Sequence, residues 1–339
     1  MKLYRNLIIL TLILTTVVVV FGAYVRLADA GLGCPDWPGC YGKLTPTLAS
    51  EQIAEAYQAN PHGPVSMPKA WKEMIHRYLA TGVGMLIMAI VAVAWARRRE
   101  EGTAPFASTT LLGVVIFQGL LGMWTVTMLL KPAIVTAHLI GGMTTLGLLT
   151  WIAMQAGRVP RILMPASTVL LARVAFIALA AQIILGGWVS TNYAALACTD
   201  FPTCNGSWWP QADYSSAFQI RRELGMTAQG ELLSNEALTA IHWLHRMGAV
   251  VAGGVLAALA WALRGHPQLR SLGVALFGAL ALQLVLGVLN VLLSLPLLLA
   301  AAHNAGAALL VVIMVCISYQ LRRGSVAAGA ESGGFQRVQ

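Results

Sequence analysis

The chain alternates between long apolar segments and shorter polar stretches. Each apolar segment holds roughly 20 or more residues, which is the length that an α-helix needs to cross the hydrocarbon core of a bilayer. The eight segments fall at about 7–27, 71–95, 106–129, 133–155, 166–191, 237–263, 271–293 and 297–320. This pattern predicts an all-α, polytopic membrane protein with eight transmembrane helices.

Basic residues cluster at the N-terminus, in every second connection between the apolar segments, and near the C-terminus. The clusters are Lys2/Arg5, Arg97-Arg98-Arg99, Arg158/Arg161, Arg264/Arg270 and Arg322/Arg323. Because Lys and Arg are enriched in cytoplasmic segments, we expect both termini in the cytoplasm of a bacterium and both long connections, 28–70 and 192–236, on the periplasmic side of its inner membrane. The first apolar segment is longer than the core of a usual signal peptide, so we expect it to be retained.

The composition agrees with a protein whose surface mostly faces lipid. Of the 339 residues, 58% are apolar and only 10% are charged, which is too little polar surface for a soluble domain. The net charge of +9 is typical of some nucleic-acid-binding proteins. Here the basic residues occur in short clusters between apolar segments, so we expect contact with membrane lipid and no nucleic-acid partner.

An internal repeat divides the chain into two similar halves. An offset of 164 positions carries Gly22 to Gly186, and an offset of 165 carries Gln118 to Gln283. Further matches include Cys34 and Cys198, Asp36 and Asp200, Cys40 and Cys204, Gly122 and Gly287, and His138 and His303. We therefore expect two pseudo-symmetric four-helix bundles, 1–160 and 161–323, related by an axis along the membrane normal. The small, polar segment 324–339 is expected to be a disordered tail.

Four of the five cysteines form two pairs with the same spacing. Cys34 and Cys40 lie in the first periplasmic connection, and Cys198 and Cys204 lie in the second. Disulfide bonds persist in this oxidising compartment. A structural zinc site is the alternative, but its paired cysteines usually have two to four residues between them, not five. The spacing and the compartment favour two disulfides.

Four histidines occupy equivalent places in the two halves. His76 and His138 lie toward the outer ends of the second and fourth spans, and His245 and His303 lie toward the outer ends of the sixth and eighth. A single histidine in a span is as often a packing residue, but ionisable residues there usually mark function. Two imidazoles on a pair of helices suit the axial positions of a heme iron, so we predict one heme site in each half.

Two further positions refine this prediction. Arg77 and Arg246 follow two of the histidines, and their guanidinium groups are candidates for pairing with heme propionates, although an arginine there also commonly reaches the headgroups. Glu73 lies one helical turn before His76, whereas the equivalent residue of the second half is His242. A carboxylate beside only one of two redox sites predicts that the halves have different roles.

These residues resemble those of the heme A synthase family. The block from Gly22 through Cys34-Pro-Asp-Trp-Pro-Gly-Cys40-Tyr-Gly is similar to its first-loop signature, and Glu73-Met-Ile-His76-Arg77 resembles its Glu-x-x-His-Arg motif. The resemblance extends from residue 7 to about 321 and covers His138, His245-Arg246 and His303. It implies oxidation of the C8 methyl group of heme O to a formyl group, through an alcohol, to give heme A for cytochrome oxidase.

The resemblance also implies how the work is divided between the halves. The C-terminal half would hold a heme b cofactor on His245 and His303, and the N-terminal half would hold the substrate near His76 and His138, with Glu73 serving the chemistry. His242 faces the same side of its helix as His245, and the arginine after His245 makes that residue the preferred ligand. Heme O synthase and cytochrome oxidase assembly factors are the implied protein partners.

Two other classes of protein share parts of the pattern. A di-heme membrane cytochrome b would also bind hemes between histidines on helix pairs, and the difference between Glu73 and His242, together with the family motifs, favours the synthase. A transporter also commonly contains a two-fold repeat, but it would need a polar site near the middle of the membrane. The polar residues within these spans lie toward the outer side.

Overall fold

In the computed structural model, which describes residues 1–323, eight helices are long and apolar enough to cross a membrane. The N-terminal four are α1 (Lys2–Leu27), α3 (Met67–Ala96), α4 (Pro105–Thr127) and α5 (Pro132–Ala156). The C-terminal four are α6 (Ala166–Thr191), α8 (Asn235–Arg264), α9 (Arg270–Leu292) and α10 (Leu297–Gln320). The predicted all-α, eight-span architecture is therefore confirmed, and the expected tail 324–339 lies outside the described residues.

Local sequence explains where several of these helices begin. Pro105 and Pro132 occupy the first positions of α4 and α5, where a missing backbone N–H costs nothing and the fixed φ suits a helix. Ser234 precedes α8, and its hydroxyl accepts a hydrogen bond from the backbone N–H of Ala237. The polar connections therefore contain the signals that separate one apolar helix from the next.

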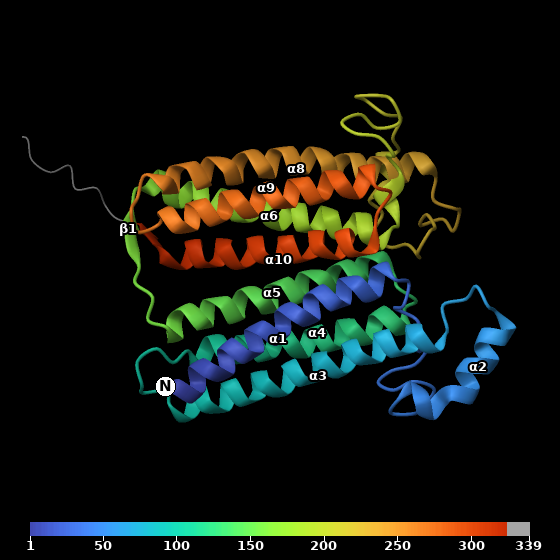
Figure 1. Ribbon diagram of the computed structural model, residues 1–339, viewed down its shortest axis with the longest axis horizontal. Helices are drawn as coiled ribbons and strands as arrows, with labels where there is room; N and C mark the ends of the chain where they lie inside the picture. The colour runs from blue at the N-terminus through green and yellow to red at the C-terminus, as the bar shows by residue number, and fades with distance from the viewer. Residues whose placement is uncertain (324–339) are drawn as a thin grey trace, which may run out of the picture.

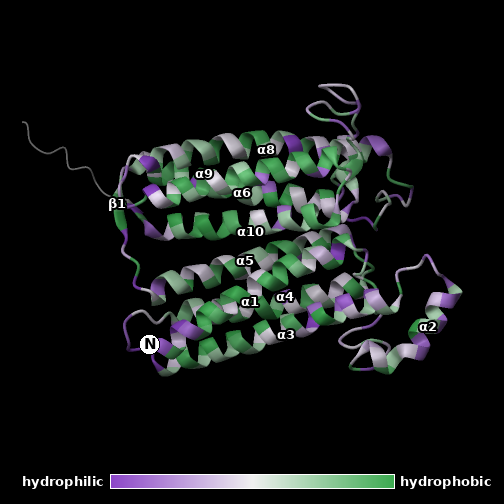
Figure 2. Cartoon of the chain, in the orientation of Figure 1, coloured by the Kyte–Doolittle hydropathy of each residue, from purple (hydrophilic) through white to green (hydrophobic). Residues whose placement is uncertain are grey.

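The helices form two groups of four, which Figure 1 shows as two stacked layers. Helices α1, α3, α4 and α5 pack among themselves, and so do α6, α8, α9 and α10. Contacts between the groups join α1 to α10, α5 to α6 and α5 to α10. Apolar residues dominate the helices along their length, and hydrophilic residues gather toward their ends (Figure 2).

The long connections contain short elements that the apolar pattern did not predict. The first has the 3-10 helix η1 (Pro46–Ala49) and α2 (Ser50–Ala59), and the second has η2 (Ala194–Leu196) and α7 (Tyr214–Ala217). On the opposite side of the molecule, strand β1 (Ile162–Met164) pairs in parallel with β2 (Leu321–Arg323). This pairing ties the segment between the two groups of helices to the end of α10.

Candidate functional site: four histidines between paired helices

Each of the four histidines lies against a glycine of the neighbouring helix. A Cβ atom added to Gly22 of α1 would lie 2.7 Å from Cε1 of His76 in α3. The corresponding Cβ–Cε1 separations are 3.3 Å for Gly122 and His138, 3.0 Å for Gly186 and His245, and 3.1 Å for Gly287 and His303. The separation at Gly22 is closer than real Cβ contacts and the other three are unusually tight, so a larger residue at any of these glycines would press on the imidazole.

The histidines of each half belong together. His76 and His138 are near enough to interact electrostatically, and so are His245 and His303. Among the described residues, Nδ1 of His76, His138 and His303 is buried and lacks a hydrogen-bond partner. A heme iron can take two axial imidazole nitrogens, so two pairs of imidazoles fit the ligand set of two hemes.

Glutamines from neighbouring helices approach three of the four histidines. The amide nitrogen of Gln118 donates to the backbone carbonyl of His138 at 2.7 Å. That of Gln182 lies 3.0 Å from both Nδ1 and the carbonyl oxygen of His245. That of Gln283 lies 3.3 Å from Nε2 of His303. Sequence reasoning used Gln118 and Gln283 only as markers of the repeat and missed Gln182, although it stands four residues before Gly186, as the other two stand before their glycines.

The first cysteine pair forms a disulfide beside the outer end of α3. Cys34 and Cys40 are bonded, with their Cα atoms 4.9 Å apart. The guanidinium group of Arg77 donates to four carbonyl oxygens of this loop, including those of Asp36 at 2.8 Å and Gly39 at 2.7 Å. Arg77 thereby holds the disulfide loop against the helix that carries His76.

The second disulfide loop repeats this arrangement on α8. Cys198 and Cys204 are bonded, with a Cα–Cα distance of 4.7 Å. Arg246 donates to the carbonyl oxygens of Asp200 and Thr203, both at 2.8 Å, and to that of Cys198 at 3.0 Å. The Asp200 carboxylate lies inside the loop, where the hydroxyl of Thr203 and the backbone N–H of Gly206 lower its pKa to about 2.

Glu73 and His242 perform the same structural task with different chemistry. The buried Glu73 carboxylate accepts a hydrogen bond from the backbone N–H of Cys34 at 2.9 Å and forms an ion pair with Arg77. Nδ1 of His242 lies 3.3 Å from the backbone N–H of Cys198, and its Nε2 lies 3.3 Å from Nε of Arg246. The residue at this position therefore links the loop, the helix and the arginine in both halves.

These contacts bear on two predicted roles. Arg77 and Arg246 already donate to loop carbonyls, so a heme propionate would have to share or replace those partners. Glu73 faces the disulfide loop and its arginine as well as lying one turn from His76. The propionate-binding role of the arginines and the catalytic role of Glu73 stay predictions. The same side chains connect the disulfide loops to the helices that carry the histidines.

Comparison with known proteins places the chain in a family. A family model described as cytochrome oxidase assembly protein matches residues 5–315. A heme A synthase from Shewanella oneidensis is 41% identical over 318 residues, covering 92% of this chain and 94% of the relative. Heme A synthases from Rhizorhabdus wittichii and Paracoccus denitrificans are 26% and 28% identical and cover 95% and 94% of this chain, and 94% and 87% of their own lengths. The chain therefore belongs to the cytochrome oxidase assembly protein family that includes these heme A synthases.

Proposed function

We propose that this protein is a heme A synthase, which oxidises the C8 methyl group of heme O to the formyl group of heme A. The observation that carries the proposal is the pairing of four imidazoles, one pair in each half, against glycines that leave room for them. Membership of a family whose relatives are named heme A synthases supplies the reaction. The product would be the heme used by cytochrome oxidase.

The two pairs would have different tasks. His245 and His303 would hold a resident heme b, which supplies one-electron redox chemistry when it is bound. His76 and His138 would bind the iron of heme O and fix the position of its methyl group within the N-terminal half. Apolar helices surround both sites, and the four histidines lie toward the helix ends that carry the polar loops.

Glu73 is the proposed proton acceptor. Oxidation of a methyl group to an aldehyde, through the alcohol, takes up one oxygen atom from water and releases protons and electrons, so the site needs a base and an external electron acceptor. Among the residues that the structure describes, Glu73 is a buried carboxylate one helical turn from a proposed ligand of the substrate iron. The Glu73 carboxylate is paired with Arg77, so a proton accepted by Glu73 would have to replace that ion pair.

The alternative of a di-heme cytochrome b predicts two equivalent electron-transfer sites. The difference between Glu73 and His242 argues against that equivalence, because only one half has a carboxylate beside its histidines. A transporter would use polar residues near the middle of the membrane. Here the polar groups of the site lie toward the ends of α3 and α8 that carry the disulfide loops.

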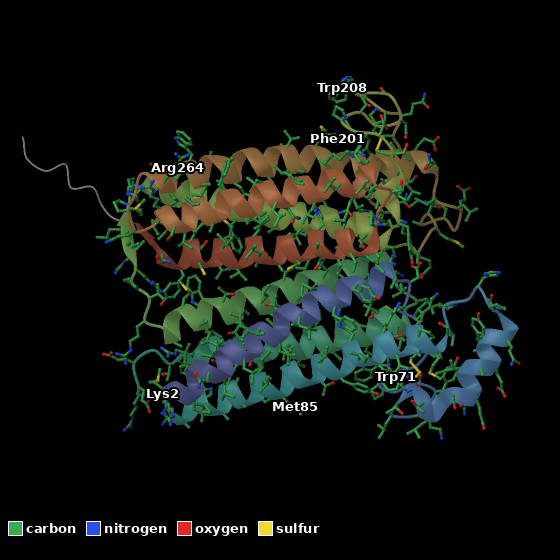
Figure 3. All side chains as sticks on the ribbon, viewed as in Figure 1. Lys2, Trp71, Met85, Phe201, Trp208 and Arg264 are labelled. Carbon is green, nitrogen blue, oxygen red and sulfur yellow. A yellow bond between two sulfur atoms is a disulfide. The ribbon has the colours of Figure 1, made fainter. Side chains whose placement is uncertain are left out.

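We also propose an orientation in the bacterial inner membrane. Lys2 and Arg264 lie at one end of the helix bundle, whereas Trp71, Phe201 and Trp208 mark the opposite end, near the disulfide loops (Figure 3). The positive-inside rule puts the first end in the cytoplasm, so both disulfides would lie in the oxidising periplasm.

Extraction of hemes from a deletion strain tests the function. Without this protein, cells are expected to lose heme A while heme O accumulates, and a plasmid copy should restore heme A. A matched copy with His76→Ala and His138→Ala should leave the strain without heme A. Normal heme A levels in the deletion strain would instead favour the cytochrome b alternative.

A further inference from the structure

A common pattern of glutamine and glycine surrounds three of the four histidines. One helix of each pair has a glutamine four residues before the glycine that lies under the imidazole, and the other has a glycine three residues after the histidine. The three sets are Gln118, Gly122, His138 and Gly141; Gln182, Gly186, His245 and Gly248; and Gln283, Gly287, His303 and Gly306. We call each set an amide clamp.

The parts of an amide clamp depend on one another. In each clamp the amide nitrogen lies within hydrogen-bond distance of the histidine ring or its carbonyl oxygen. The amide oxygens of all three glutamines are buried and lack partners among the described residues. A Cβ atom at Gly141, Gly248 or Gly306 would overlap that oxygen, so the second glycine makes room for the glutamine.

His76 is the exception. Gly22 lies under its imidazole as in the other three pairs, but Val18 stands four residues earlier, where the clamps have glutamine. Leu79 stands three residues after His76, where the clamps have glycine. Both positions that make up a clamp are therefore apolar at this histidine, whereas the unpartnered Nδ1 of His76 is shared by His138 and His303 among the described residues.

A hydrogen-bonded partner beyond the ligand controls how firmly a histidine holds a metal. A ligating histidine usually uses its second nitrogen to fix the ring orientation, and loss of that partner commonly weakens metal binding by 10- to 100-fold. Gln182 contacts Nδ1 of His245 at 3.0 Å, so it restrains the ring while leaving Nε2 for an iron. At His76 the two clamp positions hold Val18 and Leu79, whose side chains have no hydrogen-bond donor to restrain the ring.

We propose that Gln182 is a positioning residue that retains the heme of the C-terminal half, and that Val18 and Leu79 make His76 a releasable ligand, so that the N-terminal half exchanges its heme. The proposal rests on the proposed function, in which one heme stays and the other enters as substrate and leaves as product. A site that must release its product at every turnover needs at least one axial ligand that is held weakly.

The proposal is tested by removing the clamp glutamine beside His245 and by introducing the clamp residues beside His76. The full-length protein in detergent is loaded with heme b, and transfer of heme to excess apomyoglobin is followed by absorbance. Wild type should release one heme quickly and one slowly, and His303→Ala should remove the slow phase. In Gln182→Val the slow phase should become about tenfold faster, as expected for the loss of one or two hydrogen bonds.

The reciprocal variant, Val18→Gln with Leu79→Gly, should slow the fast phase by about tenfold, and electron paramagnetic resonance of that heme should show a changed low-spin signal as its axial ring becomes fixed. Val18→Leu keeps an apolar residue and should leave both phases unchanged. Unchanged release rates and spectra in both Gln182→Val and Val18→Gln/Leu79→Gly would overturn the proposal. Because the assay uses heme b and measures release, it stands apart from heme A formation, which tests the proposed function.

Discussion

At the scale of single residues, one half has Glu73 where the other has His242, and the two side chains differ in how many hydrogen bonds they can accept. A carboxylate has two oxygens, and Glu73 uses one for the backbone N–H of Cys34 and the other for Arg77. A neutral imidazole accepts at only one ring nitrogen. His242 therefore cannot accept from both Cys198 and Arg246 at once, so the second loop is held less firmly at this point.

Substitution of Glu73 separates anchoring of the loop from proton transfer. Glu73→Gln keeps an oxygen for the N–H of Cys34 but is not a base at neutral pH, whereas Glu73→Ala removes both functions. We expect both variants to retain heme b in the C-terminal half and to lose heme A formation by at least about 100-fold, which is the typical contribution of a general base. Heme extraction from complemented deletion cells gives the measurement.

Stability of the first loop provides the control for this comparison. The first loop of Glu73→Gln should resist proteolysis nearly as well as that of wild type. The loop of Glu73→Ala should be cleaved faster, because the Cys34 N–H is then buried without a partner. Heme A formation at the normal rate in Glu73→Gln would show that this residue only anchors the loop.

At the scale of secondary-structure elements, each proposed ligand depends on a pair of helices rather than on its own helix. Helix α6 supplies Gly186 under His245 of α8, and α9 supplies Gly287 under His303 of α10. Because the glycines let the backbones approach closely, the imidazoles are held between helices instead of pointing to lipid. Addition of one methyl group to a glycine of the partner helix should therefore weaken heme binding by displacing the histidine that the glycine contacts.

The variant Gly186→Ala tests this arrangement. Its Cβ atom would lie 3.0 Å from Cε1 of His245, so the ring must shift, and overpacking of this kind weakens heme binding by about tenfold or more. The matched control is Gly278→Ala in α9, whose Cβ atom would meet no heavy atom within 4 Å. Heme content of the purified proteins, measured by pyridine hemochrome, should fall for Gly186→Ala alone, and equal heme content in both would contradict the argument.

At the scale of the whole molecule, the two groups of helices meet through residues that the repeat relates to one another. Arg26 donates to the carbonyl oxygen of Ser190 at 3.0 Å, and the hydroxyl of Tyr193 donates to Asp29 at 2.8 Å. The offset of 164 carries Arg26 to Ser190 and Asp29 to Tyr193. Contacts between equivalent positions are what an axis normal to the membrane produces where two similar halves touch.

The orientation of the whole molecule is testable through its cysteines. In spheroplasts, a membrane-impermeant maleimide should label Cys34, Cys40, Cys198 and Cys204 only after addition of a reductant, because the disulfides face the periplasm. Cys316, within α10, should stay unlabelled. Labelling of the loop cysteines without reductant would contradict the disulfides, and labelling only after cell lysis would reverse the orientation.

The sequence predicted the elements well because their cause is local. Each span is a run of apolar residues long enough to cross a bilayer, and a helix satisfies its own backbone hydrogen bonds there. The repeat likewise exposed the equivalent cysteines and histidines without any knowledge of contacts. The pairing of β1 with β2 was missed, because it joins Ile162 to Leu321 across half of the chain and each strand has only three residues.

By itself, the sequence determined the eight helices, the two cysteine pairs and the four candidate ligands, since spacing and hydropathy along the chain are sufficient for these. Only the tertiary structure decided what each ligand touches. It joined Arg77 and Arg246 to the disulfide loops and brought Gln182 to His245. These contacts arise between segments far apart in the chain, and their geometry depends on how closely two helices approach, which a glycine on the partner helix permits and no local pattern measures.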